Sequence, residues 1–391
     1  MNGEEQVKSN RLMSLDALRG ADMLFIMGFS QAIIALCALL GRPDCELSRQ
    51  MTHVVWHGLR HHDTIFPLFL FLAGASWPFS LAGQVAKGRT TGEIILKIAR
   101  RVLLLFFFGL AMKPFFAFDV AHFRYDSVLA HIGVCWAAAA LLYMFVKDWR
   151  KRLLIAAGLL VGHWALLFFC RAPDAAALLA STDPAVMKKV AAYAATGTDN
   201  FSFVGCLSGW VDRVVMPGHL HEDIFDPDGL LAKMTGVVTA MFGVFAGEML
   251  RAKGTDGGRK ALGLVLAGLA CLALTFLWQP WCPVNKKIWT STFVLAVGAY
   301  SYLALAVFYW IVDVKGFRRW TFFFRVIGMN SITIYLLMRV VGFAAISKFF
   351  FSGLAGLGSA DWSRFVFALG QVAIEWLVLL FLYRKGVFLR V

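Results

Sequence analysis

The feature that most constrains this chain is a series of apolar segments, each about 20 residues long, that recurs along the sequence. A helix of that length crosses the hydrocarbon core of a bilayer, and it satisfies its own backbone hydrogen bonds in lipid. Hydrophobic residues make up 59% of the 391 residues and charged residues 16%, whereas soluble domains carry about 25% charged residues. The sequence therefore predicts an all-α polytopic membrane protein with about ten transmembrane helices, near residues 19–40, 64–84, 98–117, 128–146, 153–170, 230–250, 260–279, 289–311, 327–349 and 364–383.

Basic residues predict the orientation of these helices. Lys and Arg gather at both ends of the chain and in the connections that follow the second, fourth, sixth and eighth segments. Cytoplasmic loops carry this excess of positive charge, so both termini are expected in the cytoplasm. The formal net charge of +14 then reflects membrane orientation. Nucleic-acid binding is not expected, because it would need a soluble basic face.

The connections on the predicted outer side hold most of the unusual residues. The longest, 171–229, separates two helical halves of what we interpret as one transmembrane domain over residues 1–391. Its Ala-rich part, 172–198, predicts one or two short helices on the outer surface. Cys45, Cys206 and Cys282 also fall on this side, where a disulfide can form, but their spacing does not pair them.

Four of the chain's nine histidines, His53, His57, His61 and His62, fall in the short outer segment that ends at Asp63. Imidazole gains or loses a proton near neutral pH, so this density at a membrane boundary points to proton-transfer chemistry. One alternative is that these are simply histidines of a wet interfacial loop. A metal site is another alternative, but the spacing matches no common metal-binding motif, and no metal is predicted.

Charged residues within the apolar segments are costly and usually face a partner or a cavity. Asp16 and Arg19 are three residues apart, which favours a pair on one helix face. Arg339 and Glu375 lie at similar depth in the last two segments, so we expect an ion pair between them. The alternative is that Arg339 lines a cavity for an anionic ligand. His131 opens the fourth segment on its outer side.

Six sequence blocks in a fixed order carry a family resemblance. They are RLMSLDALRG at 11–20, HVVWHGL at 53–59 with DTIFPLFLFLAG at 63–74, VLAHIG at 128–133, DPDGLL at 226–231, PVNKKIWTS at 283–291 and GMN at 328–330. Together they resemble the transmembrane acyltransferase family typified by heparan-α-glucosaminide N-acetyltransferase, which includes bacterial NagX-like members.

The resemblance implies transfer of an acetyl group from cytoplasmic acetyl-CoA to a glucosamine-type amino sugar on the periplasmic side of a bacterial inner membrane. It implies His53 as the catalytic base or acetyl carrier, with Asp63 beside it. The candidates for binding the cofactor fall into three kinds. The cations that could bind the CoA phosphates are Arg19, Arg124, Lys286 and Lys287. The side-chain amides that could donate to the thioester carbonyl are those of Asn285 and Asn330, and the last candidate is His131. Candidates for binding the acceptor are Trp56, His57 and Asp226.

Two other functions fit the same sequence. Ten helices with charges inside the membrane would also suit a transporter for N-acetylglucosamine. An O-acetyltransferase acting on an envelope glycan or lipid is the other alternative. The expected partners are the lipid bilayer and the sugar acceptor, and the resemblance also allows a homodimer.

Overall fold

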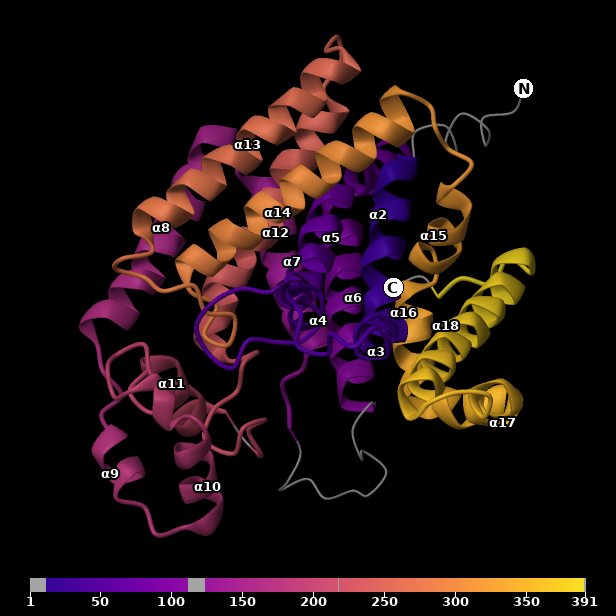
Figure 1. Ribbon diagram of the computed structural model, residues 1–391. Helices are drawn as coiled ribbons and strands as arrows, with labels where there is room; N and C mark the ends of the chain where they lie inside the picture. Colours follow the sequence, from indigo (N-terminus) through magenta and orange to yellow (C-terminus); the bar gives the residue numbers. More distant parts are fainter. Residues whose placement is uncertain (1–11, 112–123, 217, 390–391) are drawn as a thin grey trace, which may run out of the picture.

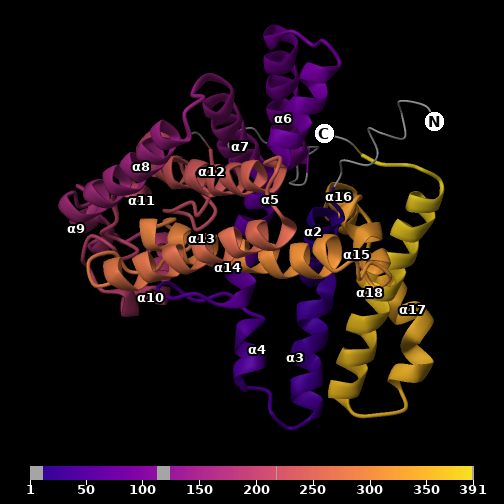
Figure 2. The same cartoon turned by 90° about the horizontal axis from the view of Figure 1, so that it is seen from above.

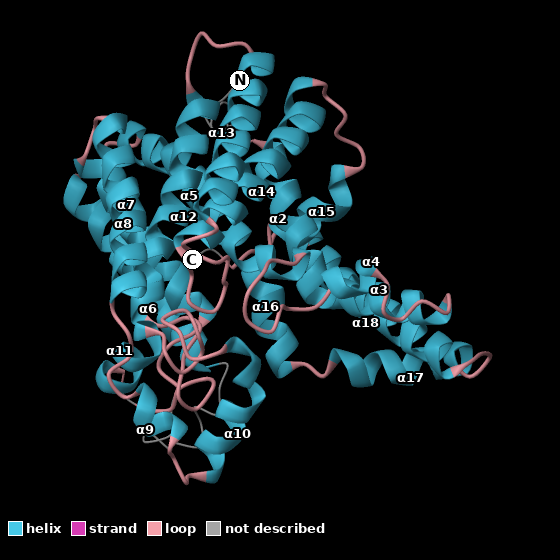
Figure 3. Cartoon of the chain, turned by 60° about the vertical axis from the view of Figure 1, so that its left-hand side comes forward, coloured by secondary structure: helices cyan, strands magenta, loops and turns pink. Residues whose placement is uncertain are grey.

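The computed structural model describes residues 12–111, 124–216 and 218–389, and apart from two isolated bridges their regular structure is helical (Figures 1 and 3). Within these ranges, 8 helices are long and apolar enough to cross a membrane. They are α2 to α3 (Met13–Leu39), α5 (His61–Ala86), α7 (Val128–Phe145), α8 (Trp149–Phe169), α12 (Leu230–Arg251), α13 (Gly257–Trp278), α14 with its π-helical end (Ser291–Val314) and α18 (Ala360–Arg384). The prediction of an all-α polytopic membrane protein is confirmed.

Two of the ten predicted segments differ from a single straight span. Helix α6 (Thr91–Ala111) carries three cations in its middle, Lys97, Arg100 and Arg101, so it is less apolar than a typical span. The end of that predicted segment, 112–117, lies outside the described residues.

The predicted ninth segment is broken into three helices. Helices α15 (Thr321–Gly328) and α16 (Ser331–Val340) meet at an angle of 65° and together could make one further span, and the short apolar helix α17 (Phe343–Ala355) follows. The bend falls at Met329 and Asn330, because Asn330 has a non-helical ψ of 25°. The placement of the termini in the cytoplasm stays a prediction.

The centre of the molecule is the contact between α5 and α12, which lie side by side along most of their length. Glycines let these backbones approach closely: a Cβ atom on Gly243 would lie 1.9 Å from the carbonyl oxygen of Phe71, and one on Gly74 would lie 2.1 Å from that of Ala240. Small residues have the same role in many membrane helix pairs. Helices α7, α14 and α2 also pack on α5, so this helix lies at the middle of the bundle.

A second group of helices lies beside this centre. Helix α3 (Ser30–Leu39) packs on α18, and α18 packs on α17 (Figure 2). The expected ion pair between Arg339 and Glu375 is not among the contacts of the described residues. Instead, Glu375 Oε1 accepts a hydrogen bond of 2.9 Å from Gln371 Nε2 in the same helix. A neighbour one turn away therefore replaces the predicted long-range partner.

The connection 171–229 folds over one end of the helices, as the lower left of Figure 1 shows. It contains α9 (Ala175–Leu179), α10 (Pro184–Ala192) and α11 (Leu207–Val215), so the short helices predicted for 172–198 are confirmed. An aromatic cluster that includes Phe203 and Phe225 joins this cap to Trp56. The interpretation of residues 1–391 as a single domain stays a prediction.

Candidate active site

His53 and Asp63 form a direct hydrogen bond where the loop after α4 enters α5. His53 Nδ1 lies 2.7 Å from Asp63 Oδ1, and the carboxylate is fully buried while 54% of the His53 side chain is exposed. An ionised carboxylate can only accept, so Nδ1 carries the proton and Nε2 keeps its lone pair. The exposed ring of His53 can therefore use Nε2 as a base or a nucleophile.

The start of α5 explains why Asp63 is fixed. As the third residue of the helix, Asp63 accepts hydrogen bonds at Oδ2 from the backbone amides of Arg60 (3.1 Å) and Val54 (3.3 Å). The first of these bonds belongs to a helix-capping arrangement, which satisfies amides that have no partner within the helix. One oxygen of Asp63 thus closes the loop and the other holds His53.

Lys286 joins the pair from a distant part of the chain. Its ammonium Nζ lies 3.4 Å from Asp63 Oδ1 and 3.1 Å from His53 Nδ1. Two N–H donors cannot bond to each other, so both are directed at the carboxylate oxygen. Burial lowers the pKa of Lys286, although the nearby Asp63 opposes this effect. Lys286 is predicted as a CoA ligand, whereas the structure places it against His53 and Asp63.

The other three histidines occupy separate environments. The ring of His62 packs at a tilt of 56° against that of His53, with centroids 4.5 Å apart, and its Nδ1 lies 3.2 Å from Ser30 Oγ. His57 Nδ1 lies 3.4 Å from the side-chain amide of Asn285, and burial lowers the pKa of His57. His61 turns away from the pair and packs against Phe25 with ring centroids 4.4 Å apart. Only His62 therefore shares the immediate surroundings of His53.

A second polar cluster, which we call the arginine clamp, lies at the N-terminal ends of α7 and α12. It is centred on Arg124, which forms a bidentate salt bridge with Asp226: Nε donates to Oδ2 at 2.7 Å and Nη2 to Oδ1 at 2.6 Å. Nη2 also donates to Asp228 Oδ2 at 2.9 Å. Burial would raise the pKa of Asp226, but the bonds and charge of Arg124 outweigh it and lower that pKa. Lys233 pairs with Asp126 and donates to the Asp228 carbonyl at 2.7 Å. Arg124 and Asp226 are thus brought together, as partners of each other.

Three more predicted residues are buried in packing roles. His131 is fully buried between Phe66 and Trp289, at ring distances of 5.3 and 4.6 Å. Trp56 is also buried and donates its indole N–H to the Phe201 carbonyl at 2.7 Å. Asn285 holds its own loop, because its side-chain oxygen accepts from the Ile288 amide at 3.2 Å.

Two more predicted residues, Lys287 and Asn330, lie apart from each other. Lys287 pairs with Glu222 of the outer cap at 2.9 Å. Asn330 sits at the bend between α15 and α16, and its Nδ2 is buried with no partner among the described residues. Its chain neighbours Met329 and Ser331 line a cavity. The described residues contain no group of three or more His, Cys, Asp or Glu side chains placed to hold a metal ion.

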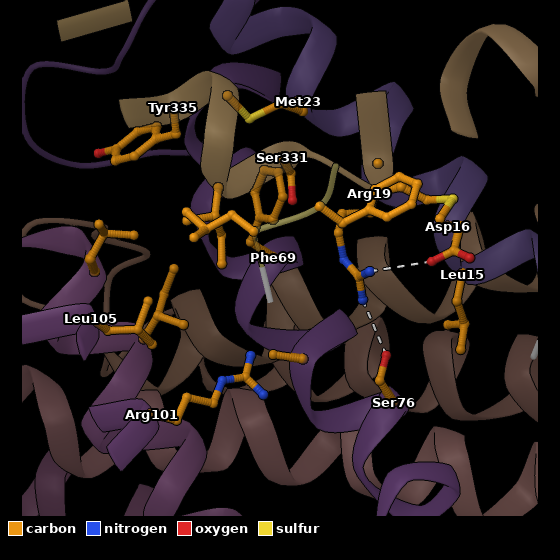
Figure 4. Close-up of a pocket in the computed structure, with 18 of the residues that line it drawn as sticks. Leu15, Asp16, Arg19, Met23, Phe69, Ser76, Arg101, Leu105, Ser331 and Tyr335 are labelled. Atoms are coloured by element: carbon orange, nitrogen blue, oxygen red, sulfur yellow. Dashed lines mark hydrogen bonds and ion pairs between the residues drawn. The ribbon is translucent and has the colours of Figure 1, made fainter. Parts of the chain in front are cut away.

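That cavity has a volume of about 530 Å³ and follows α5 from Phe66 to Ser80 (Figure 4). Fourteen residues of helix rise correspond to about 21 Å. Arg19 lies on its wall, within 3.4 Å of Asp16 and 3.1 Å of Ser76, which confirms the predicted pairing with Asp16. Arg101 is also on the wall, its guanidinium 4.0 Å from the centre of the Trp136 ring. Phe66, which also lines the cavity, is three residues from Asp63 in the same helix.

Comparison with known proteins places this site in context. A model described as a domain of unknown function, DUF5009, matches residues 11–196. Human heparan-alpha-glucosaminide N-acetyltransferase is 28% identical over 327 residues, which is 73% of this chain and 48% of the human protein. The mouse protein of the same name is 26% identical over 329 residues, with the same two coverages. This chain is a homologue of heparan-alpha-glucosaminide N-acetyltransferase. It spans about half the length of these curated relatives.

The homology confirms the resemblance predicted from the six sequence blocks, which include both His53 and Asp63. Sequence reasoning did not find Arg101 as a cavity residue, because it belongs to a cluster of cations next to a predicted cytoplasmic loop. A signal for the cavity was nevertheless present in α5, where the lining residues recur every three or four positions: Phe66, Phe69, Ala73, Ser76 and Ser80.

Proposed function

We propose that this protein is an acetyltransferase of a bacterial inner membrane, which moves acetyl from cytoplasmic acetyl-CoA to a glucosamine-type amino sugar on the periplasmic side. The observation that carries the proposal is the hydrogen bond of 2.7 Å between His53 Nδ1 and the buried Asp63. It leaves an oriented base at an exposed position, which is what acyl transfer to an amine requires. The homology to an N-acetyltransferase supports the same class of reaction.

In this mechanism His53 Nε2 removes the proton that keeps the sugar amine unreactive. The amine nitrogen then attacks the thioester carbonyl, the carbon–sulfur bond breaks, and the CoA sulfur takes up a proton. Asp63 stabilises the imidazolium that forms, and Lys286 offsets part of the negative charge of that carboxylate. In the alternative route His53 Nε2 attacks the thioester itself, the carbon–sulfur bond breaks and CoA leaves, and the sugar amine then attacks the acetyl-histidine, which breaks the bond between Nε2 and the acetyl group and frees His53. A positioned base contributes about 10²–10⁴-fold to the rate.

The cavity along α5 supports a path for acetyl-CoA through the membrane. If the basic connection after α5 is cytoplasmic, the end with Ser80 and Arg101 is the inner end. There Arg19 and Arg101 would hold phosphate groups, and the apolar wall beyond them suits the uncharged arm of CoA. Asn330 Nδ2, buried at the bend beside the cavity, is a candidate donor to the thioester oxygen as charge develops on it.

The acceptor would bind on the outer side of His53. His57, which interacts with Asn285, stays a candidate ligand of the acceptor. Trp56 and Asp226, predicted as acceptor ligands, would act indirectly, because the ring of one is buried and the carboxylate of the other is paired with Arg124. We propose that they shape the outer loops around the acceptor.

The test is acetyl transfer from radiolabelled acetyl-CoA to glucosamine by purified protein in lipid nanodiscs. We expect His53→Ala to lower the rate by about 10²–10⁴-fold. His61→Ala is the matched control, since His61 belongs to the same segment but faces Phe25, and it should keep most of the activity. Activity near wild type in His53→Ala would overturn the role of His53. Uptake of labelled N-acetylglucosamine into proteoliposomes without acetyl-CoA would instead favour a transporter.

A further inference from the structure

The outer end of α3 brings two cysteines together. Cys37 lies in the last turn of α3, and Cys45 is the residue just before the short helix α4 (Glu46–Gln50). The intervening loop folds back through two backbone hydrogen bonds, from the Arg42 amide to the Cys37 carbonyl (2.8 Å) and from the Cys45 amide to the Arg42 carbonyl (3.3 Å). Helix α4 also packs on α3. Both cysteines are free thiols in this structure, and their side chains interact with each other.

The two thiols differ in a way that suits disulfide formation. The backbone amide of Ser48 and the thiol of Cys37 lower the pKa of Cys45, so more of Cys45 is in the reactive thiolate form. Cys45 is also partly exposed, whereas Cys37 is 5% exposed. An oxidant would therefore reach Cys45 first, with Cys37 in place as the second thiol.

We propose that Cys37 and Cys45 form a disulfide when this end of the protein meets a disulfide-type oxidant. The Cys45 thiolate attacks the oxidant to give a mixed disulfide and releases one oxidant thiol. Cys37 then loses its proton and attacks Cys45 Sγ, which forms the Cys37–Cys45 bond and releases the second oxidant thiol. The two cysteines together lose two electrons and two protons, and the oxidant gains them.

The proposed disulfide lies close in sequence to the loop that carries His53. The charge pattern predicts that the outer end of α3 faces the periplasmic side, where disulfides persist. The segment after α4 leads directly to His53 and is tied to the start of α5: Gln50 Oε1 accepts from the His61 amide at 2.7 Å, and Thr52 Oγ1 accepts from Arg60 Nη1 at 2.7 Å. A disulfide would fix α4 to α3 and so restrict movement of the loop that presents His53.

The experiment is differential alkylation of the full-length protein. Free thiols are blocked with N-ethylmaleimide in intact membranes and again after unfolding; reduction and a second, heavier maleimide then mark the disulfide cysteines for mass spectrometry. We expect the heavier label on Cys37 and Cys45 and the lighter label on the exposed Cys170. In Cys45→Ser protein, Cys37 should carry the lighter label. A reductant should lower the unfolding temperature of the wild type by a few degrees and leave that of Cys45→Ser unchanged.

The proposal is overturned if both cysteines of the wild type carry the lighter label even after incubation of the membranes with oxidised glutathione. A heavier label on Cys37 and a different cysteine would also overturn it, because the pairing would then be another one. The assay reads thiol chemistry alone, so its outcome is independent of whether the protein transfers acetyl groups.

Discussion

Replacing Asp63 with Asn tests the central pair most directly, because the change is nearly isosteric. The carboxylate of Asp63 accepts on both sides, from His53 and Lys286 at one oxygen and from two backbone amides at the other. An amide has only one acceptor oxygen. In Asp63→Asn, either the helix start or His53 must therefore face an NH₂ group.

The magnitude follows from the bonds that are lost. A hydrogen bond to a charged group contributes about 1.5–3 kcal/mol. If that energy stabilises the imidazolium in the transition state, its loss lowers kcat by about 10–150-fold at 1.36 kcal/mol per tenfold change. An unsatisfied buried amide at the start of α5 would cost about 1–3 kcal/mol of stability, so the unfolding temperature should also fall.

The assay is initial-rate acetyl transfer at saturating acetyl-CoA and glucosamine, with thermal unfolding measured on the same samples. Asp256→Asn is the matched control: Asp256 caps α13 by accepting from the Gly258 amide at 2.8 Å, and Asn caps a helix as well as Asp does. We expect little change in that variant. A folded Asp63→Asn protein with wild-type kcat, or an equal loss in Asp256→Asn, would refute the reasoning.

Three further predictions follow from other groups. In Arg101→Gln the cation is lost, so the KM for acetyl-CoA should rise about tenfold, which corresponds to about 1.4 kcal/mol, while the KM for glucosamine stays unchanged. Steady-state kinetics with each substrate varied in turn would measure both constants, and an equal rise of the two would contradict this prediction. Burial would raise the pKa of Glu222, but hydrogen bonds from two lysines outweigh it and lower that pKa to about 2, from an ordinary value of 4.5. Its ionised form therefore adds stability in full above about pH 4.5, and this contribution is lost as the pH falls toward 2. The wild type should lose more thermal stability than Glu222→Gln between pH 6 and pH 3, and parallel curves would contradict this. Arg124→Leu should lower the free energy of unfolding by about 3 kcal/mol, because two buried carboxylates lose their common partner; an unchanged unfolding temperature would argue against the arginine clamp.

The sequence by itself determined the helical membrane architecture, because about 20 apolar residues in a row have few other ways to bury their backbone in lipid. The family resemblance of its sequence blocks also indicated the pair of His53 and Asp63, which lie on the same predicted side of the membrane.

Only the tertiary structure decided which distant groups meet. Lys286 reaches Asp63 across more than 200 residues of chain, and Arg101 shares a cavity with Arg19 because α2, α5 and α6 border the same space. Glu375 bonds within its own helix although a cation was predicted at the same depth. The reason is physical: hydropathy reports how deep a residue lies, whereas the rotation of each helix about its axis is set by side-chain packing, such as the close contact at Gly74 and Gly243.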